Sequence, residues 1–215
     1  MTKKRIEGQG FIALTFDDGP NITTTVEVLE KLKKYGEVAT FFLVGDHITG
    51  ETEGVVRAAY SMGCELAHHS KTHGVMSEMT RDEILREMEY TTRRIKEVIG
   101  VNPKFFRPPY IAFNDLMYEV IDLPFICGVG AEDWEPSVSS KERAHRILEQ
   151  ACDGGIILLH DMEGNVQTVE ALDIIIPELR KRGYQLVTVS QLFEIKQVVP
   201  DKTNKIIYTN VLQTK

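Results

Sequence analysis

Cysteine is scarce in this sequence, and the few cysteines present are far apart. Cys64, Cys127 and Cys152 are the only ones among 215 residues. Three scattered thiols are too few for a disulfide framework or a cysteine-based zinc site, and at least one has no partner within the chain. We expect all three to behave as small, mostly buried apolar residues.

Long apolar runs are also missing. The longest stretch, residues 38–44, has seven residues and includes Thr40, whereas a membrane-spanning helix needs about 20. The chain starts with basic residues, but the apolar run at 11–14 is too short for the core of a signal peptide. We therefore expect no membrane insertion. The compartment stays open between the cytoplasm and, for a chain whose leader has been removed, the extracellular space.

Positive charge is in deficit. Lys and Arg total 25 against 32 Asp and Glu, which makes the formal net charge −7. The chain offers no basic field to attract phosphates, so we expect no nucleic-acid partner. Neutral and cationic substrates stay open.

The remaining composition is that of an ordinary globular domain. Apolar residues make up 42% of the chain and charged residues 27%. A length of 215 residues suits one domain with a core of its own. We expect an N-terminal extension over residues 1–10, one domain over 11–195 and a C-terminal tail over 196–215.

Short apolar runs alternate with amphipathic segments along the chain. The apolar runs predict buried strands over residues 11–16, 38–44, 65–69, 104–106, 125–129, 156–159 and 185–189. The segments between them predict helices over 23–35, 55–62, 80–99, 114–121, 139–151 and 166–182, with a last helix from 190. Thr80 with Glu83, and Ser139 with Glu142, look like capping boxes. Pro177 should kink or end its helix.

This alternation predicts an α/β fold in which a parallel sheet is covered by helices. A distorted (β/α) barrel with about seven parallel strands fits, and so does an open doubly wound sheet. No Gly-x-Gly-x-x-Gly motif follows the first strand, which weakens the dinucleotide-binding version of the open sheet. Polar residues cluster where strands end. In a barrel those ends meet on one rim, so we favour the barrel.

Two histidines and two aspartates form a candidate metal site. His69 and His73 are four residues apart, a spacing that turns two imidazoles toward one point on a helix or a tight loop. Asp17 and Asp18 are adjacent at a strand end, where they repel each other unless a cation binds. One aspartate with both histidines leaves an open position on Zn²⁺ or a similar ion, as in catalytic sites. The other aspartate is then free to act as a general base.

Further residues supply the other parts of a hydrolysis. His160 ends a buried strand and is a candidate proton donor, and a carboxylate such as Asp133 beside it would keep it protonated. Arg107 is a candidate to orient an aspartate. Trp134 with Leu158 would form an apolar wall for a small acyl group.

Five motifs occur in order: Thr15-Phe-Asp-Asp-Gly-Pro20, His69-Ser-Lys-Thr-His73, Arg107-Pro-Pro-Tyr110, Asp133-Trp134 and Leu158-Leu-His-Asp161. Together they resemble the polysaccharide deacetylase family, the NodB-like carbohydrate esterases of family four. The resemblance spans residues 11–193 and implies a distorted (β/α) barrel.

The resemblance also implies a role for each matching residue. It implies one divalent metal ion, Zn or Co, held by Asp18, His69 and His73. The implied catalytic residues are Asp17 as the base, Arg107 orienting it, His160 as the acid and Asp133 tuning that acid. The backbone N–H of Tyr110 would join the metal in stabilising the oxyanion, and Trp134 and Leu158 would line the acetyl pocket.

Three positions depart from the family pattern. Ile111 stands where N-deacetylases usually have Gly, Gly74 where Pro is frequent, and His68 where Asn is common. We expect these residues at the rim of the site, where they affect the choice of substrate rather than the reaction.

The implied substrate is an acetylated polysaccharide or oligosaccharide. Residues 105–111 and 133–137 look most like esterase modules found beside bacterial xylanases. We therefore expect an acetylxylan esterase. We also expect a monomer, and the resemblance favours an extracellular location. The alternative substrate is an N-acetylglucosamine polymer, chitin or peptidoglycan.

Two readings from other classes compete. Residues 16–20 resemble the start of haloacid-dehalogenase phosphatases, but those enzymes have one residue between their two aspartates, whereas Asp17 and Asp18 are adjacent. The non-enzymatic reading is a carbohydrate-binding homologue that has lost catalysis. None of the expected metal-binding or catalytic residues is missing, which disfavours it.

Overall fold

The computed structural model describes residues 10–213 of the chain. The strands are β1 (Gly10–Asp17), β2 (Thr40–Leu43), β3 (Glu65–His68), β4 (Phe125–Ile126), β5 (Ile156–His160), β6 (Tyr184–Val187) and β7 (Ile207–Tyr208). The helices are α1 (Thr24–Tyr35), α2 (Glu53–Ser61), α3 (Arg81–Ile99), α4 (Asp115–Val120), α5 (Ser140–Gln150), α6 (Val166–Lys181) and α7 (Val189–Lys196). Residues 1–9 of the expected N-terminal extension lie outside the described residues.

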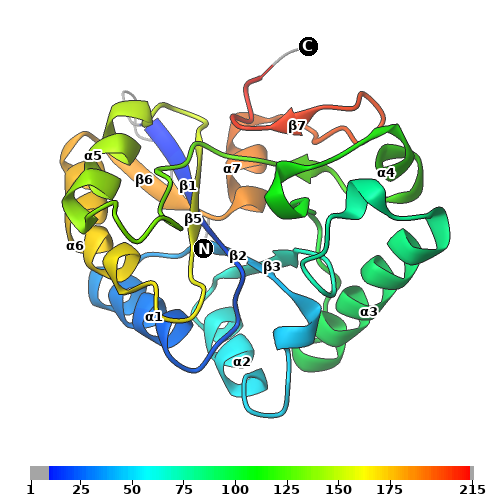
Figure 1. The fold of residues 1–215 in the computed structure, drawn as a ribbon. Helices are drawn as coiled ribbons and strands as arrows, with labels where there is room; N and C mark the ends of the chain where they lie inside the picture. The colour runs from blue at the N-terminus through cyan, green and yellow to red at the C-terminus, as the bar shows by residue number, and fades with distance from the viewer. Residues whose placement is uncertain (1–9, 214–215) are drawn as a thin grey trace.

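β1 is the centre of a parallel sheet, as Figure 1 shows. It pairs with β5 along residues 13–17, with β2 along 15–17 and with β6 along 10–13, and β2 pairs in turn with β3. β4 and β7 form a separate parallel pair. The predicted α/β class with parallel strands is confirmed.

Continuous pairing does not run all the way around a barrel within the described residues. Single bridges join His68 to Phe106, Phe106 to Phe125, and Val129 to Ile157. The expected strand at 104–106 is therefore reduced to one bridging residue, and the expected strand at 125–129 to β4. Prolines at 103, 108 and 109 flank Phe106 and cannot donate to a ladder, which limits the pairing there.

Side chains of β1 alternate between two apolar layers. Ile12 and Leu14 lie in the cluster beneath the outer helices, whereas Phe11 and Ala13 lie in a second cluster that includes side chains of α7. Each fully buried side chain of this kind contributes about 1.5–3 kcal/mol to folding. Because the period of a strand is two, Asp17 ends β1 on the same face as Phe11 and Ala13. The Asp17 carboxylate therefore lies at the carboxyl end of the sheet, on the face of this second cluster.

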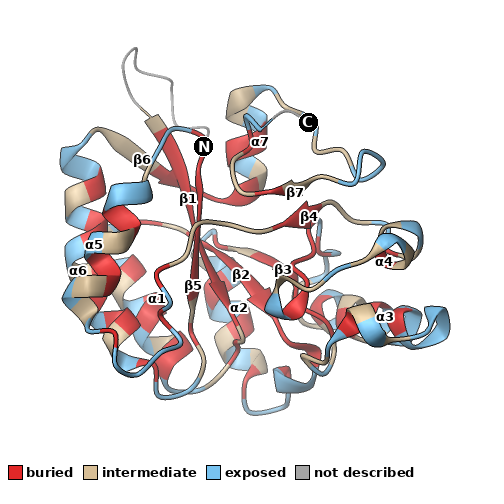
Figure 2. Cartoon of the chain, turned by 45° about the horizontal axis from the view of Figure 1, so that its top comes forward, coloured by how far each residue is buried: buried red, intermediate tan, exposed pale blue. Residues whose placement is uncertain are grey.

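The helices cover the sheet with their apolar sides. Figure 2 shows them buried toward the sheet and exposed on the outer surface. The predicted capping box of α3 is confirmed: the Thr80 side chain accepts from the Glu83 N–H, and the Glu83 carboxylate accepts from the Thr80 N–H. At α5, Ser139 accepts from the Glu142 N–H, but the Glu142 carboxylate accepts from Arg146 instead of completing the box.

α6 continues through Pro177, so of the two expected effects of this proline, a kink or an end of the helix, the end is wrong. Ile175, Ile176 and Leu179 on either side of it are 0% exposed. Packing of this face outweighs the one hydrogen bond that proline cannot make.

Only one of the three cysteines fits the expected burial. Cys64 is buried, Cys127 is half-buried and Cys152 is exposed, and none forms a disulfide. The expectation of mostly buried thiols is therefore wrong for Cys152. Within residues 10–213, no helix combines the length and the apolarity that crossing a membrane requires.

Candidate metal centre and active site

A cavity of about 630 Å³ opens at the carboxyl ends of the strands. Eight of the residues singled out from the sequence line it: Asp17, Asp18, His69, His73, Tyr110, Trp134, Leu158 and His160. The other two, Arg107 and Asp133, are fully buried behind it. The motifs therefore converge on one site, although they are spread over the chain.

The loop that carries both histidines is held by α3. The Glu87 carboxylate accepts hydrogen bonds from the backbone N–H groups of Lys71 and Thr72, both at 2.8 Å. The Thr91 hydroxyl donates to the Ser70 carbonyl at 2.8 Å. The sequence reasoning did not identify Glu87 or Thr91, because only the packing of α3 places them beneath this loop.

His68 also supports this loop from below. Its Nε2 lies 3.0 Å from the Met88 carbonyl, and its Nδ1 accepts from the Ser70 N–H at 3.0 Å. Burial lowers the pKa of His68 to about 4, so the ring is neutral. We expected His68 at the rim. It is instead 0% exposed, so that expectation is wrong.

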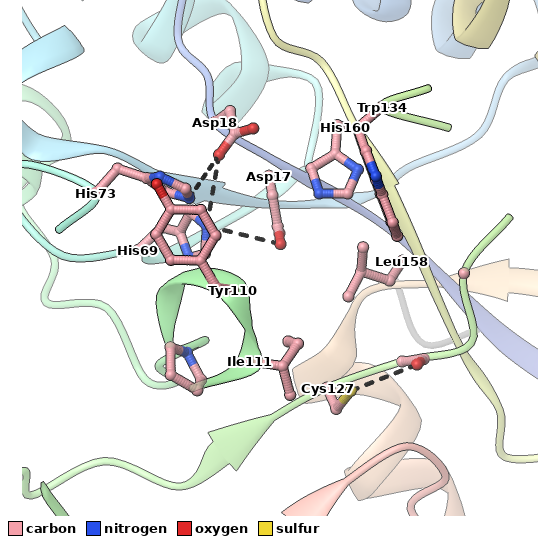
Figure 3. Close-up of a pocket in the computed structure, with 13 residues that line it drawn as sticks. Asp17, Asp18, His69, His73, Tyr110, Ile111, Cys127, Trp134, Leu158 and His160 are labelled. Carbon is pink, nitrogen blue, oxygen red and sulfur yellow. Dashed lines mark hydrogen bonds and ion pairs between the residues drawn. The ribbon is translucent and has the colours of Figure 1, made fainter. Parts of the chain in front are cut away.

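Asp18, His69 and His73 form a group that could hold a metal ion. The Asp18 Oδ1 lies 3.2 Å from the His73 Nε2 and 3.5 Å from the His69 Nε2, as the dashed lines in Figure 3 show. This Oδ1 is buried and has no hydrogen-bond partner among residues 10–213. A buried oxygen without a donor, facing two imidazoles, fits a divalent cation.

The protonation states of this group also suit a cation. The His69 Nδ1 lies 2.7 Å from the Arg107 carbonyl, which can only accept, so Nδ1 carries a proton and Nε2 is the nitrogen that offers a lone pair in the neutral ring. Burial would raise the pKa of Asp18, but His69, followed by His160 and His73, outweighs it and lowers the pKa to about 2. Burial and the neighbouring His69 lower the pKa of His73.

Asp17 also faces the His69 Nε2 and is held by Arg107. The Arg107 Nη1 donates to the Asp17 Oδ1 at 2.5 Å, and the Asp17 Oδ2 lies 3.7 Å from the His69 Nε2. The Arg107 guanidinium also lies 4.0 Å from the centre of the Phe42 ring and donates to the Cys127 carbonyl. These contacts fix Arg107, which in turn leaves Oδ2 of Asp17 as the oxygen free for a reaction.

His160 faces the cavity opposite the metal-binding group, with Asp17 between them in Figure 3. Its Nδ1 lies 2.8 Å from the Asp133 Oδ1, and the Asp133 Oδ2 accepts from the Thr168 hydroxyl at 2.8 Å. Burial lowers the pKa of His160, but the hydrogen bond and charge of Asp133, followed by Asp17, raise it to about 9. The imidazole is therefore protonated at neutral pH and has a proton that it could donate.

The pH at which the rate falls on the alkaline side should reflect the pKa of His160. We expect kcat/KM of any reaction in which His160 donates a proton to fall as the pH rises through about 9, because the imidazole then loses that proton. Asp133→Asn should move this fall down toward the ordinary imidazole pKa of about 6.5. The free energy of unfolding should depend on pH in the same direction. The raised pKa of His160 stabilises the fold fully below pH 6.5 or so, and this contribution is lost as the pH rises through about 9. A fall that stays at the same pH in Asp133→Asn would contradict the assignment.

An apolar wall completes the cavity. Leu158 is 6% exposed, Trp134 is 47% exposed, and the Trp134 ring meets His160 edge-on at 5.4 Å. Ile111 and Cys127 extend this wall below Leu158 in Figure 3. Cys127 also lines the cavity. The sequence reasoning missed it, because it lies outside the five motifs.

The backbone is strained at this site. Asp18, Ser70, His73, Tyr110 and Ile111 all have positive φ, at 78°, 66°, 58°, 58° and 53°. Such conformations are uncommon outside glycine and cluster at functional sites. The Tyr110 N–H makes no hydrogen bond within the described residues, whereas the next two N–H groups close the turn.

Comparison with known proteins adds a family and relatives. The polysaccharide deacetylase family model matches residues 4–123. A bifunctional xylanase/deacetylase from Pseudobutyrivibrio xylanivorans is 50% identical over 205 residues, which is 95% of this chain and 34% of that protein. A peptidoglycan-N-acetylmuramic acid deacetylase from Bacillus subtilis is 38% identical over 88% of this chain and 40% of its own length. The chain thus spans well under half of these relatives.

A solved structure is similar over nearly its full length. It is a family 4 acetyl xylan esterase from Clostridium thermocellum in complex with a cobalt ion. It is 40% identical, with a TM-score of 0.91 over 94% of this chain and 98% of that chain.

Proposed function

The chain belongs to the polysaccharide deacetylase family, and on that premise we propose that it is a metal-dependent hydrolase that removes O-acetyl groups from xylan. The observation that carries the proposal is the unbonded Oδ1 of Asp18 between two imidazoles, with Asp17 and His160 lining the same cavity. A base and an acid flanking a cation site are the requirements of a metal-assisted hydrolysis.

Each residue then has a defined task in the reaction. A divalent ion held by Asp18, His69 and His73 would supply Lewis-acid chemistry. Asp17 takes a proton at Oδ2 from the water that attacks the acetyl carbonyl carbon.

The remaining steps complete the hydrolysis. The Tyr110 N–H donates to the carbonyl oxygen as it gains negative charge. His160 gives its proton to the departing sugar oxygen, so that the products are acetate and a free hydroxyl.

Two observations support xylan over an N-acetylated polymer. The relatives named for xylan match more of this sequence identically than the peptidoglycan deacetylase does. In addition, the side chain of Ile111 occupies part of the cavity wall. N-Deacetylation of an N-acetylglucosamine polymer is the second candidate, which the Bacillus subtilis relative supports.

Acetate release decides between the two substrates. Metal-stripped protein should release acetate from acetylxylan faster than from chitooligosaccharides after addition of Zn²⁺ or Co²⁺. Faster release from chitooligosaccharides would overturn the xylan proposal and leave the deacetylase reaction intact. No release from either substrate would favour a non-catalytic carbohydrate-binding protein.

Ile111 should affect the choice between these substrates. Its β-branched side chain sits at a φ of 53° beside Tyr110, where glycine fits without strain. Ile111→Gly opens the wall next to a 2-acetamido group, so the ratio of kcat/KM for N-acetylglucosamine oligomers over acetylxylan should rise, by roughly 10-fold or more for a side chain of this size. Val75→Gly, at an exposed position outside the cavity lining, is the control and should leave the ratio unchanged. An unchanged ratio in Ile111→Gly would remove this residue from the explanation of specificity.

A further inference from the structure

Asp161 is a buried carboxyl group for which the proposed reaction has no use. It is 0% exposed and is not among the residues that line the cavity. It directly follows His160 at the end of β5, so a residue that points into the site is adjacent to one that does not. A buried carboxyl group needs hydrogen-bond partners. The partners of Asp161 show which part of the chain it holds in place.

Its partners among the described residues lie between the last residue of β1 and the first turn of α1. The Gly19 N–H donates to the Asp161 Oδ1 at 3.1 Å, and the Thr25 hydroxyl donates to Oδ2 at 2.5 Å. The Asp161 N–H donates to the Asp17 carbonyl at 3.0 Å. Its own carbonyl accepts from the Asn21 Nδ2 at 2.7 Å. Side chain and backbone of one residue therefore hold the whole turn.

The approach of this carboxyl explains a glycine of the first motif. A Cβ atom at position 19 would lie 2.6 Å from the Asp161 Oδ2 and 2.9 Å from Oδ1. Gly19 is not among the described glycines with positive φ, so its backbone conformation does not demand glycine. Glycine is required because the Asp161 carboxylate occupies the space that a Cβ atom would need.

Asp161 holds the peptide groups on both sides of Asp18. On one side it binds the Asp17 carbonyl, and on the other the Gly19 N–H. Asp18 lies between them with a φ of 78°, a conformation that a non-glycine residue keeps only when its surroundings impose it. This conformation sets the direction of the Cα–Cβ bond of Asp18, from which the carboxylate extends toward the imidazoles.

We propose that Asp161 is a positioning residue for metal binding, which holds Asp18 so that its Oδ1 faces the two imidazoles. It contacts neither the cavity nor the imidazoles and acts through the backbone of the ligand residue. The inference rests on the proposed metal-dependent function.

The test compares metal affinity with fold stability in Asp161→Ala and Asp161→Asn. The Zn²⁺ dissociation constant of each folded protein is measured by competition with a chromophoric chelator, and the unfolding midpoint is measured on metal-free protein. Asp161→Ala should raise the dissociation constant about 10- to 100-fold, the range found for residues that orient a metal ligand. Asp161→Asn keeps an oxygen for the Gly19 N–H and should stay close to wild type.

A matched control separates positioning from general destabilisation. Glu65 is a half-buried carboxylate at the start of β3, where it accepts from the Ser190 N–H at 2.9 Å and from the Thr40 hydroxyl at 3.2 Å. It therefore holds backbone as Asp161 does, but at the opposite end of its strand from His68. Glu65→Ala should lower the unfolding midpoint and leave the Zn²⁺ dissociation constant unchanged.

Three outcomes overturn the inference. The first is a lower midpoint in Asp161→Ala with unchanged Zn²⁺ affinity, and the second is an equal loss of affinity in Glu65→Ala. The third is a wild-type protein that binds no Zn²⁺, which alone also refutes the proposed function. If Asp161→Ala does not fold, Thr25→Val and Thr25→Ser replace it. The valine should weaken Zn²⁺ binding, the serine should preserve it, and equal affinity in both overturns the inference.

Discussion

Asp17→Asn should reduce acetate release by about 10²- to 10⁴-fold while the protein keeps its metal. Asparagine has nearly the same shape, and its carbonyl oxygen still accepts from the Arg107 Nη1, which lies 2.5 Å from the Asp17 Oδ1. An amide nitrogen at the position of Oδ2 cannot take a proton from water. Metal content and acetate release, measured on one sample, decide whether these two properties separate.

Asp18→Asn is the contrast to this variant. The Oδ1 of Asp18 is the buried oxygen that faces the two imidazoles, so its loss of charge should release the metal. Equal metal loss in Asp17→Asn and Asp18→Asn would show that the roles of the two aspartates are assigned wrongly. Retention of metal by both variants would show that the metal binds at another site.

His69→Ala should remove metal and activity together. The His69 Nε2 faces both Asp17 and Asp18, and its Nδ1–H is anchored on the Arg107 carbonyl. Asp18 and His73 alone would hold a labile ion poorly, so the loss of affinity should exceed the roughly 10- to 100-fold that loss of a merely supporting residue causes. Metal analysis after dialysis, together with acetate release, tests this.

His145→Ala is the matched control for this variant. His145 lies on α5 with its side chain 61% exposed, and among the described residues it pairs with Glu149. Metal content and acetate release should therefore stay at wild-type values in His145→Ala. Treating wild-type protein with a chelator should reproduce the loss of activity. Added Zn²⁺ should restore activity in this protein and not in His69→Ala. Activity in metal-free wild-type protein would contradict the metal-dependent mechanism.

Local signals were sufficient for most of the fold. The period of the apolar residues and the caps placed α1, α3 and α5 within a few residues of their observed bounds. Such signals are local, because a cap and an apolar face depend on residues a few positions apart. The same reasoning failed at 104–106, where pairing with distant segments decides the structure. At Pro177 it left a kink or an end of the helix open, and packing with distant segments decided that α6 continues.

The candidate site divides in the same way. Residue types and spacings were enough to name Asp17, Asp18, His69, His73 and His160, since metal and proton chemistry demands those side chains. Which atoms face each other was decided by contacts between remote segments. Arg107 reaches Asp17 across 90 positions, and Asp161 reaches Gly19 across 142.

The sequence by itself therefore determined the chemical groups of this protein and most of its strands and helices. Only the tertiary structure decided that His68 is buried beneath its loop, and that Asp161 holds the turn of Asp18. The physical reason is that a hydrogen bond needs an approach of about 3 Å between atoms. No local pattern specifies such an approach between segments that meet only after the parallel sheet has brought their ends to one rim.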